Sequence, residues 1–196
     1  MRRPLAVAIT GSIGAGKSEA LKAFARQGVP TISSDELVHR LYGEDPEVRA
    51  AIAERWGERA LDEDGSPDRG RIAEIVFADR DELRWLEGLL HPRVARAYLA
   101  WADELAHSPE PPALIATEIP LLYETGGEER FDAVVVVTAP PDVRAARGRK
   151  VRHDERTERL IPDEAKVRRA NYSYVNDGTV EELDRFVGSV VQDLTR

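Results

Sequence analysis

The 196-residue sequence predicts an α/β fold, in which five parallel strands form a sheet with helices packed on both faces. Three observations predict it. Short apolar segments alternate with segments of helical periodicity, which is typical of parallel strands joined by helices. A glycine-rich stretch occupies the first strand-to-helix junction, at residues 11–18. The helical region between the second and third predicted strands is too long for a simple crossover, which predicts an inserted helical lobe.

The first three elements follow from the spacing of apolar residues. Residues 5–10 (LAVAIT) form a short apolar run, as expected of a buried parallel strand. Apolar residues then recur at helical spacing over residues 17–27, and Gly28 ends the predicted helix. Residues 29–32 predict the second strand.

The inserted lobe is predicted over residues 35–110. Its helical pattern is interrupted by DEDGSPDRG at residues 62–70, a run of turn formers that predicts a loop. The proline-rich SPEPP at residues 108–112 predicts a stiff linker at the end of the lobe. Residues 1–34 and 111–196 then form the core of a single domain that carries one insert.

The second part of the core contains three strands and two helical stretches. Its clearest strand is AVVVVT, because nearly every residue in it is β-branched. In chain order, the predicted elements are a strand at 113–117, a strand at 133–138, a helical stretch opened by Pro140 and Pro141, a short strand at 172–175, a turn at 176–178 and an amphipathic helix at 180–194.

Composition excludes several classes of function. The chain has no cysteine, so disulfides, thiolate zinc sites and cysteine nucleophiles are excluded, and we expect a cytoplasmic protein. Its formal net charge of −8 argues against nucleic acid as a partner. No segment has the length of a signal-peptide core or a membrane span, so we expect no membrane partner. The four histidines lack metal-ligand spacing, and we expect no tightly held metal.

The sequence GSIGAGKS matches the phosphate-loop pattern G-x-x-x-x-G-K-[ST] in full. Glycines let successive backbone N–H groups converge on one anion, and the following helix adds its positive dipole end. Lys17 can reach the terminal phosphates, and the Ser18 hydroxyl can ligate Mg²⁺. The alternative is that small residues simply permit tight strand–helix packing. The predicted ATP-binding residues are Gly11, Ser12, Ile13, Gly14, Ala15, Gly16, Lys17, Ser18 and Glu19.

Other nucleotide-binding classes fit the sequence less well. The spacing does not match the dinucleotide pattern G-x-G-x-x-G. A GTPase would carry Asn-Lys-x-Asp after a later strand, where this chain reads APPDVR. The small size and the helical insert favour the three-layer sandwich of a P-loop kinase of the nucleoside-monophosphate-kinase type.

Five further stretches are characteristic together: the opening from the phosphate loop to the aspartate after the second strand, DGSPDRGRIAEIVFAD and LEGLLHPRV in the lobe, EIPLLYETG at the end of a strand, and NDGTVEEL before the last helix. With these motifs in this order, the sequence resembles the dephospho-coenzyme A kinase family over nearly its whole length. The resemblance implies transfer of the ATP γ-phosphoryl group to the ribose 3′-hydroxyl of dephospho-coenzyme A, the last step of coenzyme A biosynthesis. It implies ATP and Mg²⁺ as cofactors, and we expect a monomer.

Two carboxylates are candidates for the chemistry that this resemblance implies. Asp35 follows the second strand, and we interpret it as the base that takes the proton of the acceptor hydroxyl. The alternative is that it caps the following helix. Glu118 ends the third strand and is expected to order Mg²⁺ through water or to hydrogen-bond the acceptor.

The acceptor pocket is expected to be lined by the segment that follows Glu118, with Tyr123 stacking on an apolar group; ordinary packing under the lobe is the alternative. His91, with Pro92, is expected to orient the lobe helices toward the acceptor, or else to be a buried structural histidine. The residues of this segment are Pro120, Leu121, Leu122, Tyr123 and Glu124.

Residues 144–169 are rich in Lys and Arg, which is typical either of a solvated helix face or of an anion site. The family resemblance implies a mobile lid at residues 144–160. We expect Arg147 to neutralise charge on the transferred group, with Arg144 and Arg152 as helpers. Asn176 is a candidate for adenine contact, with a turn-forming role as the alternative.

The chain departs from the usual pattern of the family at four places. Ser33 stands where an aspartate is usual, and Ala95 stands where an arginine is usual. The lid is several residues shorter than usual, and Glu19 stands where a small hydroxyl residue is common. These departures leave two alternatives open: a nucleotide-binding relative that has lost kinase activity, or a kinase for another nucleoside-like acceptor.

Overall fold

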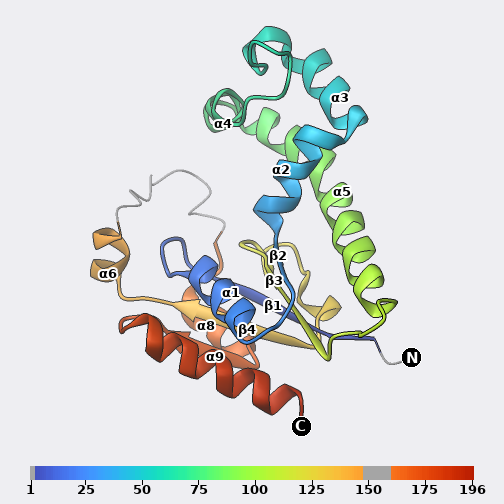
Figure 1. Ribbon diagram of the computed structural model, residues 1–196. Coiled ribbons are helices and arrows are strands. Elements are labelled where there is room, and N and C mark those ends of the chain that lie inside the picture. Colours follow the sequence, from blue (N-terminus) through green and yellow to red (C-terminus); the bar gives the residue numbers. More distant parts are fainter. Residues whose placement is uncertain (1–2, 148–159) are drawn as a thin grey trace. The chain divides into compact units, whose positions relative to one another are not determined.

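The structure, a computed structural model, describes residues 3–147 and 160–196 (Figure 1). The chain divides into two compact units. We call residues 1–34 with 104–196 the core unit, and residues 35–103 the lobe.

The core unit is built on a five-stranded parallel sheet in the order β2-β3-β1-β4-β5. The predicted α/β architecture is therefore confirmed. Because β1 lies at the centre of the sheet, the phosphate-loop sequence that follows it emerges between β3 and β4. The strands are β1 (Leu5–Gly11), β2 (Thr31–Ser33), β3 (Leu114–Glu118), β4 (Ala133–Thr138) and β5 (Tyr172–Val175).

Helices cover both faces of the sheet. Two helices of the core unit, α1 and α9, contact each other and lie on the same face (Figure 1). A capping box formed by Thr179 and Glu182 starts α9. The helices of the core unit are α1 (Lys17–Arg26), the 3-10 helix η2 (Glu128–Arg130), α6 (Pro141–Ala146), α8 (Asp163–Arg169) and α9 (Val180–Leu194).

The period of two in the strands divides the core into two clusters. Val7 and Ile9 of β1 are buried with α1 and α9 on one face, whereas Ala8 is buried on the opposite face with Leu122 and Tyr123. The same alternation runs along β4. This sheet with packing on both faces is the three-layer arrangement that the buried apolar strands predict.

The second strand begins two residues later than predicted, at Thr31 rather than at residue 29. The backbone N–H of Val29 donates to the carbonyl oxygen of Phe24 at 3.1 Å, so Val29 lies beyond α1 and helps to cap its C-terminal end. Pro30 has no N–H to donate to a ladder. Its carbonyl oxygen accepts from the N–H of Ala116 at 3.0 Å, which leads the chain into β2.

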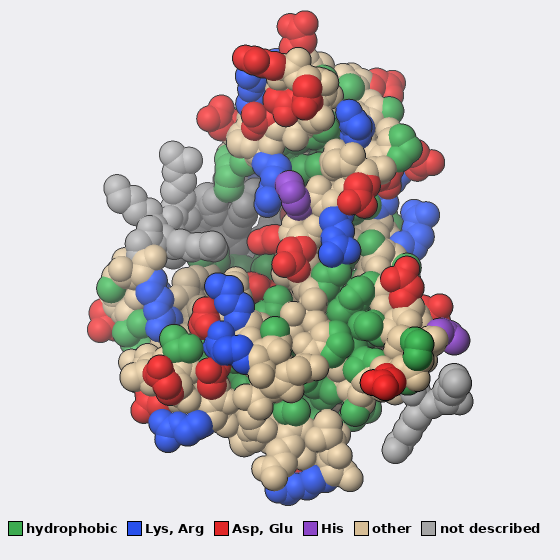
Figure 2. Space-filling view, viewed as in Figure 1, with side chains coloured by type: hydrophobic (Ala, Val, Ile, Leu, Met, Phe, Trp, Pro, Cys, Tyr) green, Lys and Arg blue, Asp and Glu red, His purple; other side chains and the backbone are tan. Residues whose placement is uncertain are grey.

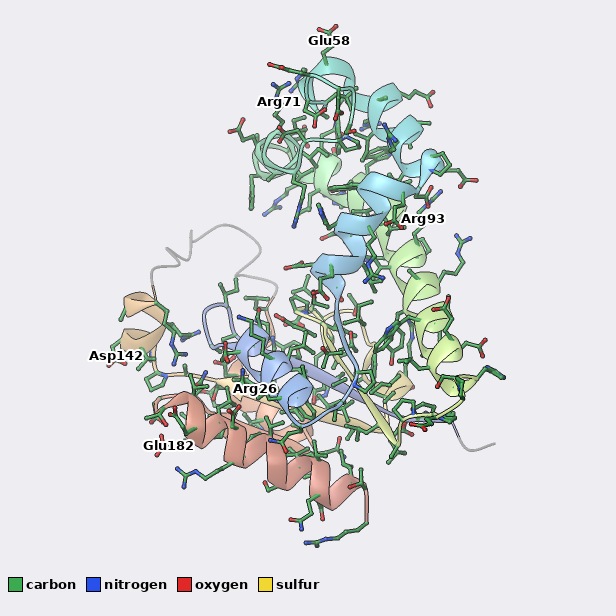
Figure 3. The ribbon with its side chains drawn as sticks, in the orientation of Figure 1. Arg26, Glu58, Arg71, Arg93, Asp142 and Glu182 are labelled. Carbon is green, nitrogen blue, oxygen red and sulfur yellow. The ribbon has the colours of Figure 1, made fainter. Side chains whose placement is uncertain are left out.

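The lobe is helical, as its sequence predicts, with its own core around Ile52, Trp56 and Ile72. Arg71 donates to the carbonyl oxygen of Glu58 and closes the predicted loop, near the tip of the lobe in Figure 3. The helices are α2 (Ser34–Glu44, its first residue in the core unit), α3 (Pro46–Trp56), the 3-10 helix η1 (Gly57–Arg59), α4 (Arg69–Ala78) and α5 (Arg80–Ala106), of which the last runs on into the core unit and holds Pro92 in its interior.

Acidic and basic side chains are interspersed on the face of the core unit that carries α1 and α9 (Figure 2). Arg26 lies between these two helices (Figure 3) and pairs with Asp184 at 2.6 Å and with Glu19 at 2.9 Å. Because Arg26 is exposed and both of its partners are partly exposed, each pair contributes little to stability. Among the described residues, no helix is both long enough and apolar enough to cross a membrane.

Asp132 connects the start of β1 to the segment before β4. Its Oδ2 accepts from the backbone N–H of Ala6 at 2.8 Å, and the Arg3 guanidinium donates to both carboxylate oxygens at 2.7 and 2.8 Å. The hydrogen bond from Arg3, helped by the bond from Ala6, holds the pKa of Asp132 below its ordinary value of 3.8. A carboxylate whose pKa is lower in the folded state contributes stability above its unfolded pKa and loses it as pH falls through the folded pKa.

We therefore predict that Asp132→Asn lowers the free energy of unfolding by roughly 1.5 kcal/mol at pH 7. The gap between variant and wild type should shrink as pH falls below the ordinary Asp pKa of 3.8. Urea unfolding at pH 7 and pH 3 measures it, with the exposed Asp142→Asn as the control. A gap that stays constant with pH would contradict a charge-based role for Asp132.

Candidate active site

The phosphate-loop sequence joins β1 to α1 through three glycines with positive φ: Gly11 at 138°, Gly14 at 79° and Gly16 at 95°. Gly16 is the N-cap of α1, and no side chain caps this helix, in contrast to α3, α4 and α9. A helix start that no side chain caps is suited to binding an anion with its backbone N–H groups and its dipole.

Gly11 is required by close approach as well as by its backbone conformation. A β-carbon at this position would lie 1.9 Å from the carbonyl oxygen of Val137 in β4. We predict that Gly11→Ala lowers the free energy of unfolding by about 3 kcal/mol, through overpacking and strain at positive φ. Urea unfolding measures the loss.

The matched control for Gly11→Ala is Gly188→Ala in α9. A β-carbon at Gly188 would find its nearest neighbours at ordinary contact, 3.6 Å away. This variant should gain about 0.5–1 kcal/mol, because alanine favours a helix over glycine. A Gly11→Ala protein as stable as the wild type would contradict the close approach of β1 and β4.

Lys17 and Ser12 are connected within the loop. Lys17 is buried at the start of α1, and its Nζ donates to the carbonyl oxygen of Ser12 at 3.0 Å. The Ser12 hydroxyl donates to the carboxylate of Asp163 in α8. Ser18 is exposed, and its hydroxyl oxygen is a hard ligand of the kind that Mg²⁺ prefers. The Lys17 side chain thus extends into the loop, and the Ser18 side chain is exposed in the first turn of α1.

Arg147 and Asn176 hold the loop from outside. The Arg147 guanidinium donates to the carbonyl oxygens of Ala15 at 3.2 Å and Asn176 at 3.0 Å. The Asn176 side chain is buried, and its Nδ2 donates to the same Ala15 oxygen at 2.8 Å. The sequence predicts neither contact, because both join residues far apart in the chain. In this structure both side chains support the backbone of the loop.

The remaining predicted loop residues are placed around this core. Ile13 is 37% exposed at the tip of the loop. Glu19 pairs with Arg26 and with Lys22, at 2.9 and 3.6 Å, so its charge is partly offset on α1. A β-carbon added at Gly14 would lie 3.4 Å from the β-carbon of Arg144. Arg152 and most of the predicted lid, residues 148–159, lie outside the described residues.

Glu118 and Asp35 follow adjacent strands of the sheet. Glu118 is buried at the end of β3, in register with Ile9 of β1 and Ser33 of β2. The Ser34 hydroxyl donates to the carbonyl oxygen of Glu118 at 3.0 Å. Asp35 is exposed in the first turn of α2, where a negative charge interacts favourably with the helix dipole. The helix begins before Asp35, at Ser34, so Asp35 lies inside the first turn rather than before it.

The predicted acceptor segment is partly a packing segment. Leu122 and Tyr123 are buried against the sheet, whereas Pro120 is half-buried and Leu121 is 37% exposed. The Arg169 guanidinium lies 4.5 Å from the centre of the Tyr123 ring. Burial raises the pKa of the Tyr123 hydroxyl, which has no hydrogen-bond partner among the described residues.

Sequence reasoning misses the next contact along this segment, a buried ion pair. Lys166 Nζ lies 2.7 Å from Oε1 of Glu124, and the two side chains are 2% and 10% exposed. Lys166 lies in the basic run at residues 144–169, but that pattern does not distinguish it from its neighbours, because a lysine in a short polar helix is ordinarily solvated. The pair joins α8 to the segment that follows β3.

His91 is exposed on α5 beside Pro92, so it is not a buried structural histidine. Within residues 3–147 and 160–196, no group of three or more His, Cys, Asp or Glu side chains is arranged to hold a metal ion.

Comparisons with known proteins agree on one family. A family model described as dephospho-CoA kinase matches residues 5–182. A dephospho-CoA kinase from Aquifex aeolicus is 33% identical, with 97% of each chain covered. One from Thermosynechococcus vestitus is 36% identical and covers 100% of this chain and 98% of its own.

Solved structures agree on the fold. The protein TT1252 from Thermus thermophilus is 31% identical, with 100% of each chain covered and a TM-score of 0.75. A dephospho-CoA kinase from Campylobacter jejuni is 24% identical and has a TM-score of 0.69, with 97% of this chain and 96% of its own covered.

Proposed function

Because this chain belongs to the dephospho-CoA kinase family, we propose that it transfers the γ-phosphoryl group of ATP to the ribose 3′-hydroxyl of dephospho-coenzyme A. The product is coenzyme A, and the reaction is the last step of its biosynthesis. The observation that carries the proposal is coverage: relatives of this name match the chain from end to end, including its phosphate loop and lobe.

ATP would bind at the loop from Gly11 to Ser18. The three glycines with positive φ and the uncapped start of α1 support an anion there. Lys17 would release the carbonyl oxygen of Ser12 and contact the terminal phosphates instead. Mg²⁺ bound with ATP would withdraw charge from those phosphates, with the Ser18 hydroxyl as its protein ligand.

The transfer step forms a bond between the acceptor 3′-oxygen and the γ-phosphorus. The bond from that phosphorus to the bridging oxygen breaks, and ADP leaves. The proton of the hydroxyl passes to the Asp35 carboxylate and then to solvent. Glu118 is buried at the carboxyl end of β3. We assign it to hydrogen-bonding the acceptor or to ordering Mg²⁺ through water.

The remaining roles rest on position in the chain. Arg147 would support the loop, because its guanidinium contacts a loop carbonyl oxygen. As a cation beside the loop, it would also stabilise charge on the transferred group. Leu121 and Pro120 are the more accessible members of the acceptor segment, whereas Leu122 and Tyr123 would shape it from beneath. His91 of α5 keeps its proposed role as an acceptor-binding residue.

The setting of this reaction is also part of the proposal. We place it in the cytoplasm, since its donor is ATP, with small molecules as its partners. The expectation of a monomer is kept as part of this proposal. The alternatives of a kinase for another acceptor, or a relative without kinase activity, find no support in the comparisons.

The experiment that tests the proposal is ADP release from ATP and Mg²⁺ with dephospho-coenzyme A, adenosine, AMP or no acceptor. We expect turnover with dephospho-coenzyme A alone. Turnover with adenosine or AMP would indicate a different acceptor. Binding of ATP with no acceptor-dependent turnover would indicate a protein that has lost the kinase reaction.

A further inference from the structure

We propose that Lys166 is a positioning residue, which fixes the acceptor segment relative to the phosphate loop through a buried ion pair with Glu124. This inference rests on the proposed function, because it assigns a purpose to a contact beside that site. It concerns a residue that the sequence patterns do not single out.

The ion pair is well enclosed. Lys166 is 2% exposed, and its Nζ lies 2.7 Å from Glu124 Oε1. The same carboxylate oxygen accepts from the backbone N–H of Ile161 at 3.1 Å. Two donors from the neighbourhood of α8 therefore converge on one oxygen of the segment that follows β3.

Two further contacts extend from the same side of α8. Asp163, Lys166 and Arg169 are spaced three residues apart, so their side chains leave neighbouring positions on one face of the helix. Asp163 accepts from the hydroxyl of Ser12 in the phosphate loop. Arg169 pairs with Glu128 and lies over the Tyr123 ring.

Together these contacts connect two parts of the proposed site. One end of α8 holds the loop that would bind ATP, and the middle and far end hold the segment proposed for the acceptor. We call this set of contacts the α8 brace. Because Lys166 is the most buried of the three side chains, its contact should tolerate least movement.

Stability alone does not account for a buried ion pair. Desolvation of the two charges offsets much of their attraction, so an apolar pair of similar volume is often as stable. What the charged pair adds is a defined geometry, since the ammonium and the carboxylate must meet at hydrogen-bond distance. A misplacement of about 1 Å between reacting groups can lower a rate about 100-fold.

The test is a double-mutant cycle of Lys166→Met, Glu124→Gln and the double variant. The single Lys166→Met leaves a buried carboxylate without its cation, so its Tm should fall. The double variant removes that charge, and its Gln can still accept from Ile161. The control is Arg168→Met, which removes a basic side chain at an exposed position of the same helix.

We expect kcat to fall about 100-fold in Lys166→Met and to stay equally low in the double variant while Tm recovers. The KM for ATP should change much less than kcat, and Arg168→Met should match the wild type. Recovery of kcat together with Tm would reduce Lys166 to a structural role. Effects of the two single variants that multiply would show that Lys166 does not act through Glu124. Either result overturns the proposal.

Amide hydrogen exchange separates this proposal from the proposed function. In Lys166→Met and in the double variant, residues 119–130 should exchange faster than in the wild type and in Arg168→Met. This readout needs no acceptor, so it tests the brace even if the wild type fails to phosphorylate dephospho-coenzyme A. Unchanged exchange in the double variant would overturn the brace, whatever the acceptor.

Discussion

Replacing Lys17 with Met is expected to lower kcat for acceptor-dependent ADP release by about 10³-fold, or about 4 kcal/mol in the transition state. Lys17 is buried at the start of α1, with its ammonium directed into the loop toward the carbonyl oxygen of Ser12. A cation there can follow the charge that develops on the transferred phosphoryl group. Met fills the space of the lysine side chain as far as its ε-carbon and removes the ammonium group, with its charge and its donors.

The matched control for Lys17→Met is Lys22→Met, on the same helix. The Lys22 side chain is 70% exposed and pairs with Glu19 at 3.6 Å. Its loss should leave kcat within about 2-fold, because an exposed pair contributes little. Equal losses in both variants would indicate a general effect of charge on α1, and full activity in Lys17→Met would contradict phosphate binding by this loop.

Asp35→Asn is expected to lower kcat by about 10²–10⁴-fold, the usual contribution of a general base. Asn keeps the size of Asp and a side-chain oxygen in the first turn of α2. The substitution removes only the negative charge, which interacts favourably with the helix dipole. The free energy of unfolding should therefore fall by about 0.5 kcal/mol. Steady-state turnover and urea unfolding on the same preparations measure both quantities.

Glu36→Gln supplies the control for Asp35→Asn. It makes the same change of charge in the same turn of α2, at another exposed position. A large loss of activity with little loss of stability in Asp35→Asn alone would support the base and show that Ser33 is compatible with catalysis. Near-normal turnover in Asp35→Asn would contradict the assignment and leave Asp35 a role in helix stability only.

The sheet could be predicted because its strands carry their own signal. The run Ala133–Thr138 is nearly all β-branched, and the observed β4 has those bounds. The sequence pattern places the start of the second strand too early, because Val29 is apolar like a strand residue, yet its N–H caps the end of α1. Local pattern identifies an element, whereas its ends depend on individual hydrogen bonds.

The candidate site could be predicted only in part. The phosphate loop is contiguous in the chain, so its glycines and Lys17 can be predicted from the sequence. The contacts of Arg147 and Asn176 with Ala15 join residues more than 130 positions apart. The pair of Lys166 with Glu124 likewise depends on how the fold brings α8 to the sheet. Such contacts cannot be predicted from local sequence patterns, because they form only when tertiary packing brings distant residues together.

The measurement that tests the central claim most directly is the location of the transferred phosphate. The wild-type protein would be incubated with ATP, Mg²⁺ and dephospho-coenzyme A, and the product analysed by mass spectrometry and ³¹P NMR. We predict one new phosphomonoester on the ribose 3′-oxygen and a product that matches authentic coenzyme A. Phosphate recovered only as inorganic phosphate, or on a different hydroxyl group, would contradict the account.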